Sequence, residues 1–217
     1  MPRSIILIRH AESEHHVKRL SGGWTDTPIT ERGHRQARLL AERLKDELGE
    51  TPVRLFTSDL LRTRETAGRR AAALALEPVP DARLREFNNG EAANLTVDEA
   101  LRRFPQPPGP WGADHRGFPG GETWRELYAR AAAFLADLPD DGRLPLVVTH
   151  GGTTIGLVAG WLGLSAETTQ RIGFSAHVTG VTVLQRDDHG YSRIERLNDI
   201  AHLAGSEGHV PLSAAIG

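Results

Sequence analysis

The stretch Ile5-Ile6-Leu7-Ile8-Arg9-His10 does more than any other part of the sequence to decide the fold. A short, continuous run of large aliphatic residues, bounded by polar ones, is typical of a strand buried on both faces, as in a parallel sheet. Two later segments have the same form, Val53 to Thr57 and Leu146-Val147-Val148. The first and third runs are followed by histidines, His10 and His150. We therefore predict three buried strands with polar side chains at their carboxyl ends.

Helical patterns lie between these strands. They run from Thr30, a suitable N-cap, to Gly49; from a cap at Ser58 or Asp59; from Thr123 to Leu138; and from His150 to about Trp161. Strands that alternate with helices indicate an α/β fold, which we expect to be a three-layer α/β/α sandwich with a mostly parallel central sheet. Val181 to Gln185 and Tyr191 to Leu197 flank a turn and predict a hairpin at the sheet edge.

The stretch from about Phe87 to Gly121 interrupts this alternation. Thr96-Val97-Asp98-Glu99 is a capping box that opens a short helix, and a cluster of prolines and glycines from Pro105 to Pro110 prevents regular structure after it. Helical periodicity resumes at Thr123, so we predict one domain over residues 1–217, with residues 87–121 as a small cap-like excursion over the active site. The residues after Ala204 predict a frayed tail.

The bulk composition narrows the class of function. The chain has 217 residues, with 26 Lys and Arg against 28 Asp and Glu, so no global field attracts nucleic acid or anionic membranes. The absence of cysteine excludes disulfides and thiolate metal sites. The apolar run near the N-terminus is too short for a signal peptide or a membrane span, which predicts a cytoplasmic protein.

The strand ends carry the residues that removal of a phosphoryl group requires. Ligands of open α/β sheets bind at the carboxyl ends of the strands, so neighbouring strands would bring His10, His150, Arg9 and Arg62 to one crevice. Guanidinium groups match phosphate oxygens and keep their charge. Two of them near an imidazole lower its pKa and keep it neutral, as an attack on phosphorus requires.

Further groups complete the expected site. His150 can donate to the oxygens on which charge builds up, and the helix starts after Ser58 and His150 offer backbone N–H donors. Glu86, at the start of the excursion, is the best candidate for the acid that protonates the leaving oxygen. Gly22-Gly23 and Gly151-Gly152 are consistent with plain turns, but both pairs flank the expected site, where backbone donation to phosphate fits the sequence at least as well. Gly23 and Gly151 are the candidate phosphate-binding residues among them.

These residues lie in motifs that resemble the histidine phosphatase (phosphoglycerate mutase-like) superfamily, and its phosphatase branch in particular. The resemblance spans nearly the whole chain, with its blocks in order: Leu7-Ile8-Arg9-His10-Ala11-Glu12-Ser13, Gly23-Trp24-Thr25-Asp26, Ile29-Thr30-Glu31-Arg32-Gly33, Thr57-Ser58-Asp59-Leu60-Leu61-Arg62-Thr63, Leu84-Arg85-Glu86, Gly120-Gly121-Glu122-Thr123, Val147-Val148-Thr149-His150-Gly151 and Leu197-Asn198-Asp199.

The resemblance implies a metal-independent phosphomonoesterase that turns over through a phosphohistidine. His10 would be the nucleophile, Glu86 the acid that then activates water, His150 the second histidine, and Arg9 and Arg62 the phosphate clamps.

The chain departs from the family pattern at three places. Ala11 replaces the usual glycine after the nucleophile, and His15-His16 stands where a Trp-Asn pair is frequent. Since the family asparagine helps to hold the phosphoryl group, either His16 replaces it with a ring nitrogen or the contact is lost. Gly90 to Asn94 replaces a frequent Gly-x-Trp-Glu-Gly pattern, which bears on the substrate more than on the chemistry.

Two other functions remain as alternatives to a phosphatase of a small phosphorylated metabolite. One is a phosphoglycerate-type mutase with the same phosphohistidine, and the other is a non-catalytic module that binds a phosphorylated ligand. We expect no metal or cofactor, because the spacing of the histidines from His10 to His34 matches no ligand pattern; His15 and His16 are expected at the rim. Trp24, Phe87, Trp111, Phe118 and Trp124 are as consistent with core packing as with a substrate pocket. The identity of the substrate and the oligomeric state are not predicted.

Overall fold

A computed structural model of the chain describes residues 2–74 and 76–205. Its six-stranded sheet has the order β3-β2-β4-β1-β5-β6. The strands are β1 (Ser4–Arg9), β2 (Val53–Thr57), β3 (Val79–Pro80), β4 (Leu144–Thr149), β5 (Val181–Arg186) and β6 (Ser192–Asp199). Strands β3, β2, β4 and β1 are parallel, whereas β5 and β6 are antiparallel to their neighbours and form the predicted edge hairpin. The α/β class and the mostly parallel sheet are confirmed.

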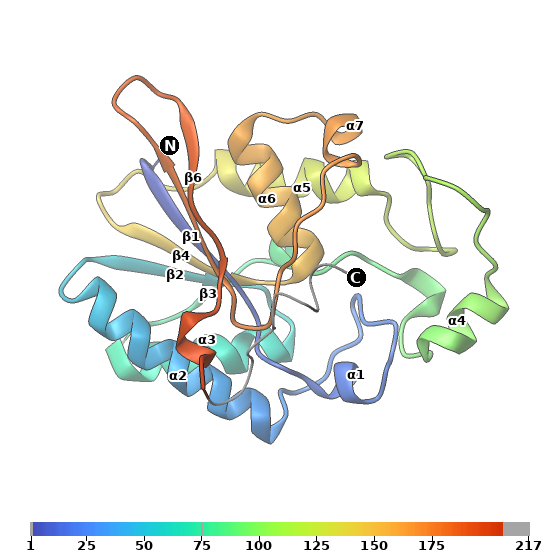
Figure 1. Cartoon of the computed structure of the whole chain (residues 1–217), viewed down its shortest axis with the longest axis horizontal. Helices are drawn as coiled ribbons and strands as arrows, with labels where there is room; N and C mark the ends of the chain where they lie inside the picture. The colour runs from blue at the N-terminus through green and yellow to red at the C-terminus, as the bar shows by residue number, and fades with distance from the viewer. Residues whose placement is uncertain (1, 75, 206–217) are drawn as a thin grey trace.

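Helices cover both faces of the sheet (Figure 1). Helices α5 and α6 lie on one face and α2 and α3 on the other, whereas α4 stands away from the sheet beyond the strand ends. The helices are α1 (Glu14–Val17), α2 (Glu31–Leu48), α3 (Leu61–Leu74), α4 (Val97–Arg103), α5 (Trp124–Ala136), α6 (Gly151–Leu162) and α7 (Ala166–Thr169). Three 3₁₀ turns, Ala82–Leu84, Gly90–Ala92 and Ala201–Leu203, complete the described elements.

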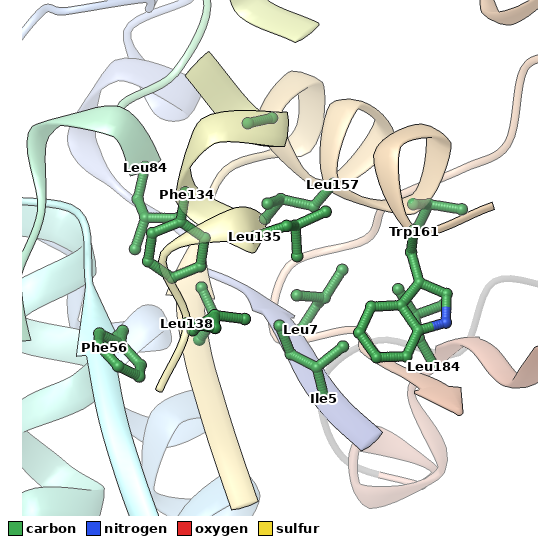
Figure 2. Packing of buried hydrophobic residues seen from close by; sticks show 13 residues of the cluster. Ile5, Leu7, Phe56, Leu84, Phe134, Leu135, Leu138, Leu157, Trp161 and Leu184 are labelled. Carbon is green, nitrogen blue, oxygen red and sulfur yellow. The ribbon is translucent and has the colours of Figure 1, made fainter. Parts of the chain in front are cut away.

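Strand β1 is buried on both faces because its alternate side chains enter two different cores. Ile5 and Leu7 pack with α5 and α6 in the cluster shown in Figure 2, around Phe134 and Trp161. Ile6 and Ile8 point to the opposite cluster, which contains residues of α2 and β2. Burial on both faces explains why the sequence shows a continuous apolar run here instead of an alternating one.

The order of the strands brings the three predicted strand ends together. Strand β4 lies between β1 and β2, with Arg9 opposite Thr149 and Thr57 opposite Val148. The backbone continues this pairing beyond the strands, since His10 N donates to Thr149 O at 2.9 Å and Ser58 N donates to Val148 O at 3.1 Å. The residues that follow β1, β2 and β4 therefore share one edge of the sheet.

The start of α3 differs from the sequence prediction. Ser58 Oγ accepts from Leu60 N at 3.3 Å, but the first helical N–H, that of Leu61, donates to Asp26 Oδ1 at 2.7 Å. Both carboxylate oxygens of Asp59 accept from Arg85. The prediction that this helix start donates to phosphate is therefore wrong for Leu61: a carboxylate from another loop already accepts its N–H.

The other helix boundaries agree closely with the pattern. The Thr30 side chain accepts from Gly33 N, and Gly49 ends α2 with a φ of 50°. Thr96 and Thr123 form capping boxes at the starts of α4 and α5. The predicted fraying after Ala204 concerns mainly residues 206–217, which lie outside the described part of the chain. Among residues 2–74 and 76–205, no helix has the length and apolar character needed to span a membrane.

Candidate active site

His10 follows directly on β1 and is almost completely buried. Its Nδ1–H donates to Ala11 O at 2.7 Å, which leaves the lone pair on Nε2. Burial holds the pKa of His10 well below its ordinary value, and His150, Arg62, Arg9 and His16 lower it further. The ring is therefore a neutral imidazole with its lone pair on Nε2.

Three more histidines surround this ring. His150 meets it edge-on with the centroids 5.1 Å apart, His16 stacks nearly parallel at 5.4 Å, and His15 lies at 5.8 Å. Burial lowers the pKa of His15 to about 3 and that of His16 to about 4, with neighbouring charges contributing to both. His15 is only 8% exposed and its Nδ1 contacts Ser13 Oγ at 2.8 Å, so its prediction as a rim residue is wrong.

Arg62 comes from the first turn of α3 and has no exposed surface. It donates through Nη1 to Thr25 O at 2.6 Å and through Nη2 to Gly23 O at 2.7 Å, while its Nε lies 3.3 Å from His10 Nε2. Burial lowers its pKa to about 10, which still leaves the group charged near neutral pH. Since a guanidinium has five N–H groups, one remains on each terminal nitrogen for a ligand.

Arg9, the last residue of β1, donates to two partners. Its Nη1 donates to Ala176 O, and its Nη2 donates to His16 Nε2 at 2.9 Å. A neutral imidazole has one lone pair, so His16 accepts from only one of the two N–H donors that face it, Arg9 Nη2 at 2.9 Å from Nε2 and Ser13 N at 3.3 Å from Nδ1. The shorter contact, from a charged donor, favours the tautomer that accepts at Nε2. His16 thus orients Arg9 beside His10.

The two ring nitrogens of His150 and the Arg9 Nε are buried and have no hydrogen-bond partner among the described residues. Buried polar atoms of this kind are rare in proteins and need an explanation. His150 Nδ1 and Nε2 and Arg9 Nε all belong to groups around His10. An anion bound next to His10 Nε2 would accept from the Arg9 Nε–H and from the ring N–H of His150.

Glu86 lies on the loop that follows the 3₁₀ turn Ala82–Leu84. Its Oε1 accepts from Phe87 N at 2.8 Å, and its Oε2 accepts from Gly152 N, near the start of α6, at 3.2 Å. The charge of Glu86 raises the pKa of both Arg9 and Arg62 against the larger effect of their burial. The carboxylate therefore belongs to the same charged cluster as the two guanidinium groups.

The backbone of Glu86 is held from two directions. Arg130 of α5 donates to Glu86 O at 3.0 Å, and Trp24 Nε1 donates to the same oxygen at 2.8 Å. Arg130 also donates to the carbonyl oxygens of Arg83 and Arg85, and it forms a two-bond ion pair with the half-buried Glu122. The Gly-Gly-Glu-Thr motif thus supplies Glu122, the partner of the arginine that holds the loop around Glu86, here called the acid loop. The spacing of the motifs alone did not reveal this pairing.

A cavity of about 370 Å³ opens above these groups. Of the predicted site residues, those that line it are Arg9, His10, His16, Gly23, Arg62 and Glu86. His150 and Gly151 are not part of its lining; His150 is completely buried behind it. A larger cavity of about 730 Å³, beside Thr57 and Arg64, contains none of the predicted site residues.

The predicted aromatic residues fall into two groups, according to whether they line the cavity of about 370 Å³ beside His10. Phe87 and Trp124 line it, with ring centroids 4.9 Å apart. Trp24 instead lies beneath the Arg85 guanidinium, Trp111 stacks on His115, and Phe118 contacts Phe104. The lining also includes His15, Gly22 and Gly152, and three residues that the sequence did not single out for the site, Leu20, Ser21 and Asn89.

The two predicted binding glycines differ in their structural constraints. Gly23 has a φ of +62°, and a Cβ there would lie 2.8 Å from Phe87 O, so both conformation and space require glycine. Its carbonyl accepts from Arg62. Gly151 opens α6, where a Cβ would lie at an ordinary 3.7 Å from Arg9 Nε.

Three imidazoles come closer together than their sequence spacing indicates. One ring nitrogen each of His10, His15 and His16 lies within 4.8 Å of the others, a cluster that could hold a metal ion. However, Arg62 Nε and Arg9 Nη2 already face His10 Nε2 and His16 Nε2. Two adjacent guanidinium charges favour an anion over a cation at this position.

Comparison with known proteins places the chain in a family. A model described as "Histidine phosphatase superfamily (branch 1)" matches residues 5–200. A "Probable phosphoglycerate mutase GpmB" of Photorhabdus laumondii subsp. laumondii is 34% identical over 215 residues, which cover 92% of this chain and 94% of the relative. The corresponding protein of an Enterobacter species is 37% identical over 177 residues, 77% of this chain and 79% of that one.

Solved structures agree with this placement. A structure titled "Mycobacterial hydrolase 1" has a TM-score of 0.76 and 27% identity, covering 91% of this chain and 98% of that one. A mycobacterial glucosyl-3-phosphoglycerate phosphatase, solved with inorganic phosphate, has a TM-score of 0.76 and 25% identity, covering 93% and 100%. The α-ribazole phosphatase of Shigella flexneri shares the fold, with a TM-score of 0.78 at 23% identity over 96% of this chain and 100% of that one. The chain belongs to branch 1 of the histidine phosphatase superfamily.

Proposed function

We propose that the protein is a phosphomonoesterase that forms a covalent phosphohistidine on His10. The observation that carries this proposal is the state of His10, a buried neutral imidazole with its lone pair on Nε2, next to Arg9, Arg62 and a cavity. A neutral ring is needed for attack, and the guanidinium groups supply the charge that binds the phosphate oxygens.

The proposed reaction has two steps. First, His10 Nε2 attacks phosphorus and the bond to the leaving oxygen breaks, while Glu86 as the acid gives its proton to that oxygen. Second, Glu86 as the carboxylate takes a proton from water, the resulting hydroxide attacks phosphorus, and the bond to Nε2 breaks to release phosphate. Arg9, Arg62 and an N–H of His150 bind the oxygens on which charge accumulates in both steps.

The cavity supports a small substrate with a single anionic group. Its volume of about 370 Å³ suits a metabolite, and residues 87–121, the proposed cap, contribute Phe87 and Asn89 to its lining. Its only cationic side chains among the described lining residues are Arg9 and Arg62, which the phosphoryl group occupies. Arg85 and Arg130 nearby are paired with Asp59 and Glu122. A second acidic group on the substrate therefore has no dedicated partner there.

A phosphoglycerate-type mutase remains the second candidate, because the relatives at 34% and 37% identity carry that name. Such an enzyme must bind the carboxylate of phosphoglycerate as well as its phosphate. The distribution of cations in the cavity therefore favours the phosphatase.

The test is to measure phosphate release from a panel of phosphorylated metabolites and isomerisation of 3-phosphoglycerate, for the wild type and for His10→Ala. For the wild type, we expect phosphate release from substrates whose phosphate is their only acidic group, and little isomerisation. Both activities should be lost in His10→Ala. Robust isomerisation would establish the mutase, and equally slow hydrolysis by both proteins would favour a non-catalytic binding module.

We also propose that the reaction needs no metal ion. The positive charges around His10 support this, although the three clustered imidazoles offer nitrogen ligands. Dialysis against a chelator should leave kcat and KM unchanged, and vanadate should inhibit. Activity that is lost on chelation and restored by a transition metal would refute metal independence.

A further inference from the structure

We propose that Gly152 is a positioning residue for Glu86: its missing side chain and its backbone N–H together hold the carboxylate in place. This inference rests on the proposed function, in which Glu86 handles the proton of the leaving group. Gly152 is the second residue of α6, and it lines the cavity together with Glu86 and Trp124.

The backbone conformation does not explain why residue 152 is glycine. The described glycines with a left-handed φ include Gly22, Gly23 and Gly163, but not Gly152, which lies within a regular helix. Glycine is among the least favourable residues in a helix, and alanine is the most favourable. On helical propensity alone, alanine would be the better residue here.

The space around Gly152 does explain it. A Cβ at this position would lie 2.6 Å from Glu86 Oε1 and 3.6 Å from Cη2 of Trp124. The first distance is too short for any real contact, so a side chain at residue 152 would displace the carboxylate. At the neighbouring Gly151, the Cβ would lie at ordinary contact distances, 3.7 Å from Arg9 Nε and 3.8 Å from Glu86 Oε2.

The hydrogen bonds of Glu86 make this close approach informative. Gly152 N donates to Oε2 at 3.2 Å, while Phe87 N donates to Oε1 at 2.8 Å. The carbonyl of Glu86 is held by Trp24 and Arg130, so the backbone cannot move to relieve a clash. Any displacement must be taken up by the carboxylate, which would leave its position near the Arg9 and Arg62 charges.

This arrangement makes Gly152→Ala a selective probe. The atom it meets is the end of a flexible side chain, so the fold can accept the new methyl group while the acid moves. The assay compares kcat/KM for 4-nitrophenyl phosphate and for phenyl phosphate, two substrates of similar size. Phenolate is much the more basic leaving group, with a pKa for phenol of about 10, as for tyrosine. The ratio kcat/KM reports formation of the phosphoenzyme even where its hydrolysis limits kcat.

We expect Gly152→Ala to lower kcat/KM for phenyl phosphate by about tenfold or more, and that for 4-nitrophenyl phosphate by less than about threefold, because proton donation matters most to a basic leaving oxygen. Glu86→Gln should give the same pattern with a larger loss. In the Glu86→Gln background, Gly152→Ala should cause no further selective loss, because there is no acid left to displace.

Gly151→Ala is the matched comparison. Its Cβ would lie at ordinary contact distances from both Arg9 and Glu86 and so would not displace the carboxylate; any change it causes should be equal for the two substrates. Circular dichroism and thermal unfolding of each variant separate a local displacement from a general loss of structure.

The inference is refuted if correctly folded Gly152→Ala lowers kcat/KM equally for the two substrates, or for neither of them. It is also refuted if the selective loss persists unchanged in the Glu86→Gln background. A wild-type protein that releases no phosphate from either substrate would instead refute the proposed function itself.

Discussion

At the scale of single residues, the chemistry depends on the neutral state of His10. Burial is the largest cause of its lowered pKa, and the nearby charges of His150, Arg62 and Arg9 add to it. The sequence prediction named the guanidinium groups as the cause; the structure places desolvation first. An imidazole kept neutral mainly by desolvation stays neutral well below pH 6.5, as the proposed nucleophile must.

The first prediction concerns the covalent intermediate. Acid quenching would destroy a phosphohistidine, so the protein should be denatured in alkali after brief incubation with ³²P-labelled substrate. We expect label that survives base, is lost in acid, and is absent from His10→Ala. Label that is stable in acid would point to a phosphoester on another residue.

The second prediction concerns His16, which stands where the resemblance implies asparagine. Its Nε2 accepts from Arg9 Nη2 at 2.9 Å and so orients a group that we propose binds phosphate. His16→Asn keeps an acceptor and should retain most activity, whereas His16→Leu should lower kcat/KM by about tenfold, the size expected for a lost bond to a charged donor. Equal losses in the two variants would show that orientation of Arg9 is not the role of His16.

At the scale of elements, α5 supports the acid loop through one side chain. Arg130 donates to the carbonyl oxygens of Arg83, Arg85 and Glu86 and pairs with Glu122, with both side chains mostly buried. Lysine has the same charge but cannot form this fork of hydrogen bonds.

The third prediction is therefore that Arg130→Lys lowers both stability and activity. We expect a loss of about 1–3 kcal/mol in the free energy of unfolding, typical of a broken buried network, together with reduced kcat/KM. Arg125→Lys is the control on the same helix, since Arg125 pairs with Asp114 and Glu167 at the surface and its loss should change the melting temperature little. Similar effects in both variants would contradict a special role for Arg130.

At the scale of the whole molecule, several histidines make stability depend on pH. Burial lowers the pKa values of five histidines: His10, His15, His16, His150 and His202. The pKa falls to about 3 for His15 and to about 4 for His16 and His202. Below pH 6.5 the unfolded chain binds protons at these residues while the folded chain does not. The contribution of these neutral histidines to the free energy of unfolding is thus fully present above about pH 6.5 and is lost as the pH falls towards 4.

The fourth prediction follows with its magnitude. Each such histidine should lower the free energy of unfolding by up to about 1.4 kcal/mol per pH unit in this range. Urea unfolding at pH 7.5, 6 and 5 should show a steep decline. His202→Gln removes one of these groups outside the cavity. The slope of the free energy of unfolding against pH should therefore be smaller by up to about 1.4 kcal/mol per pH unit, the contribution of one proton. An unchanged slope would mean that His202 does not contribute.

Local signals in the sequence predicted five of the six described strands, most of the helices and the candidate residues Arg9, His10, Arg62, Glu86 and His150. Strong local signals carry these predictions: the buried run of β1, the capping threonines of α4 and α5, and the histidines at strand ends. General rules of α/β sheets place ligands at the carboxyl ends of the strands. The observed order β2-β4-β1 shows that these three strands are neighbours.

Only the tertiary structure decided which atoms face one another. That Asp26 occupies the start of α3, that His15 is buried, and that Gly152 leaves room for Glu86 all depend on contacts between residues far apart in the chain. Local propensity and motif spacing contain no information about such contacts. They arise from the packing of loops at the sheet edge, which fixes the geometry of the acid and the shape of the cavity.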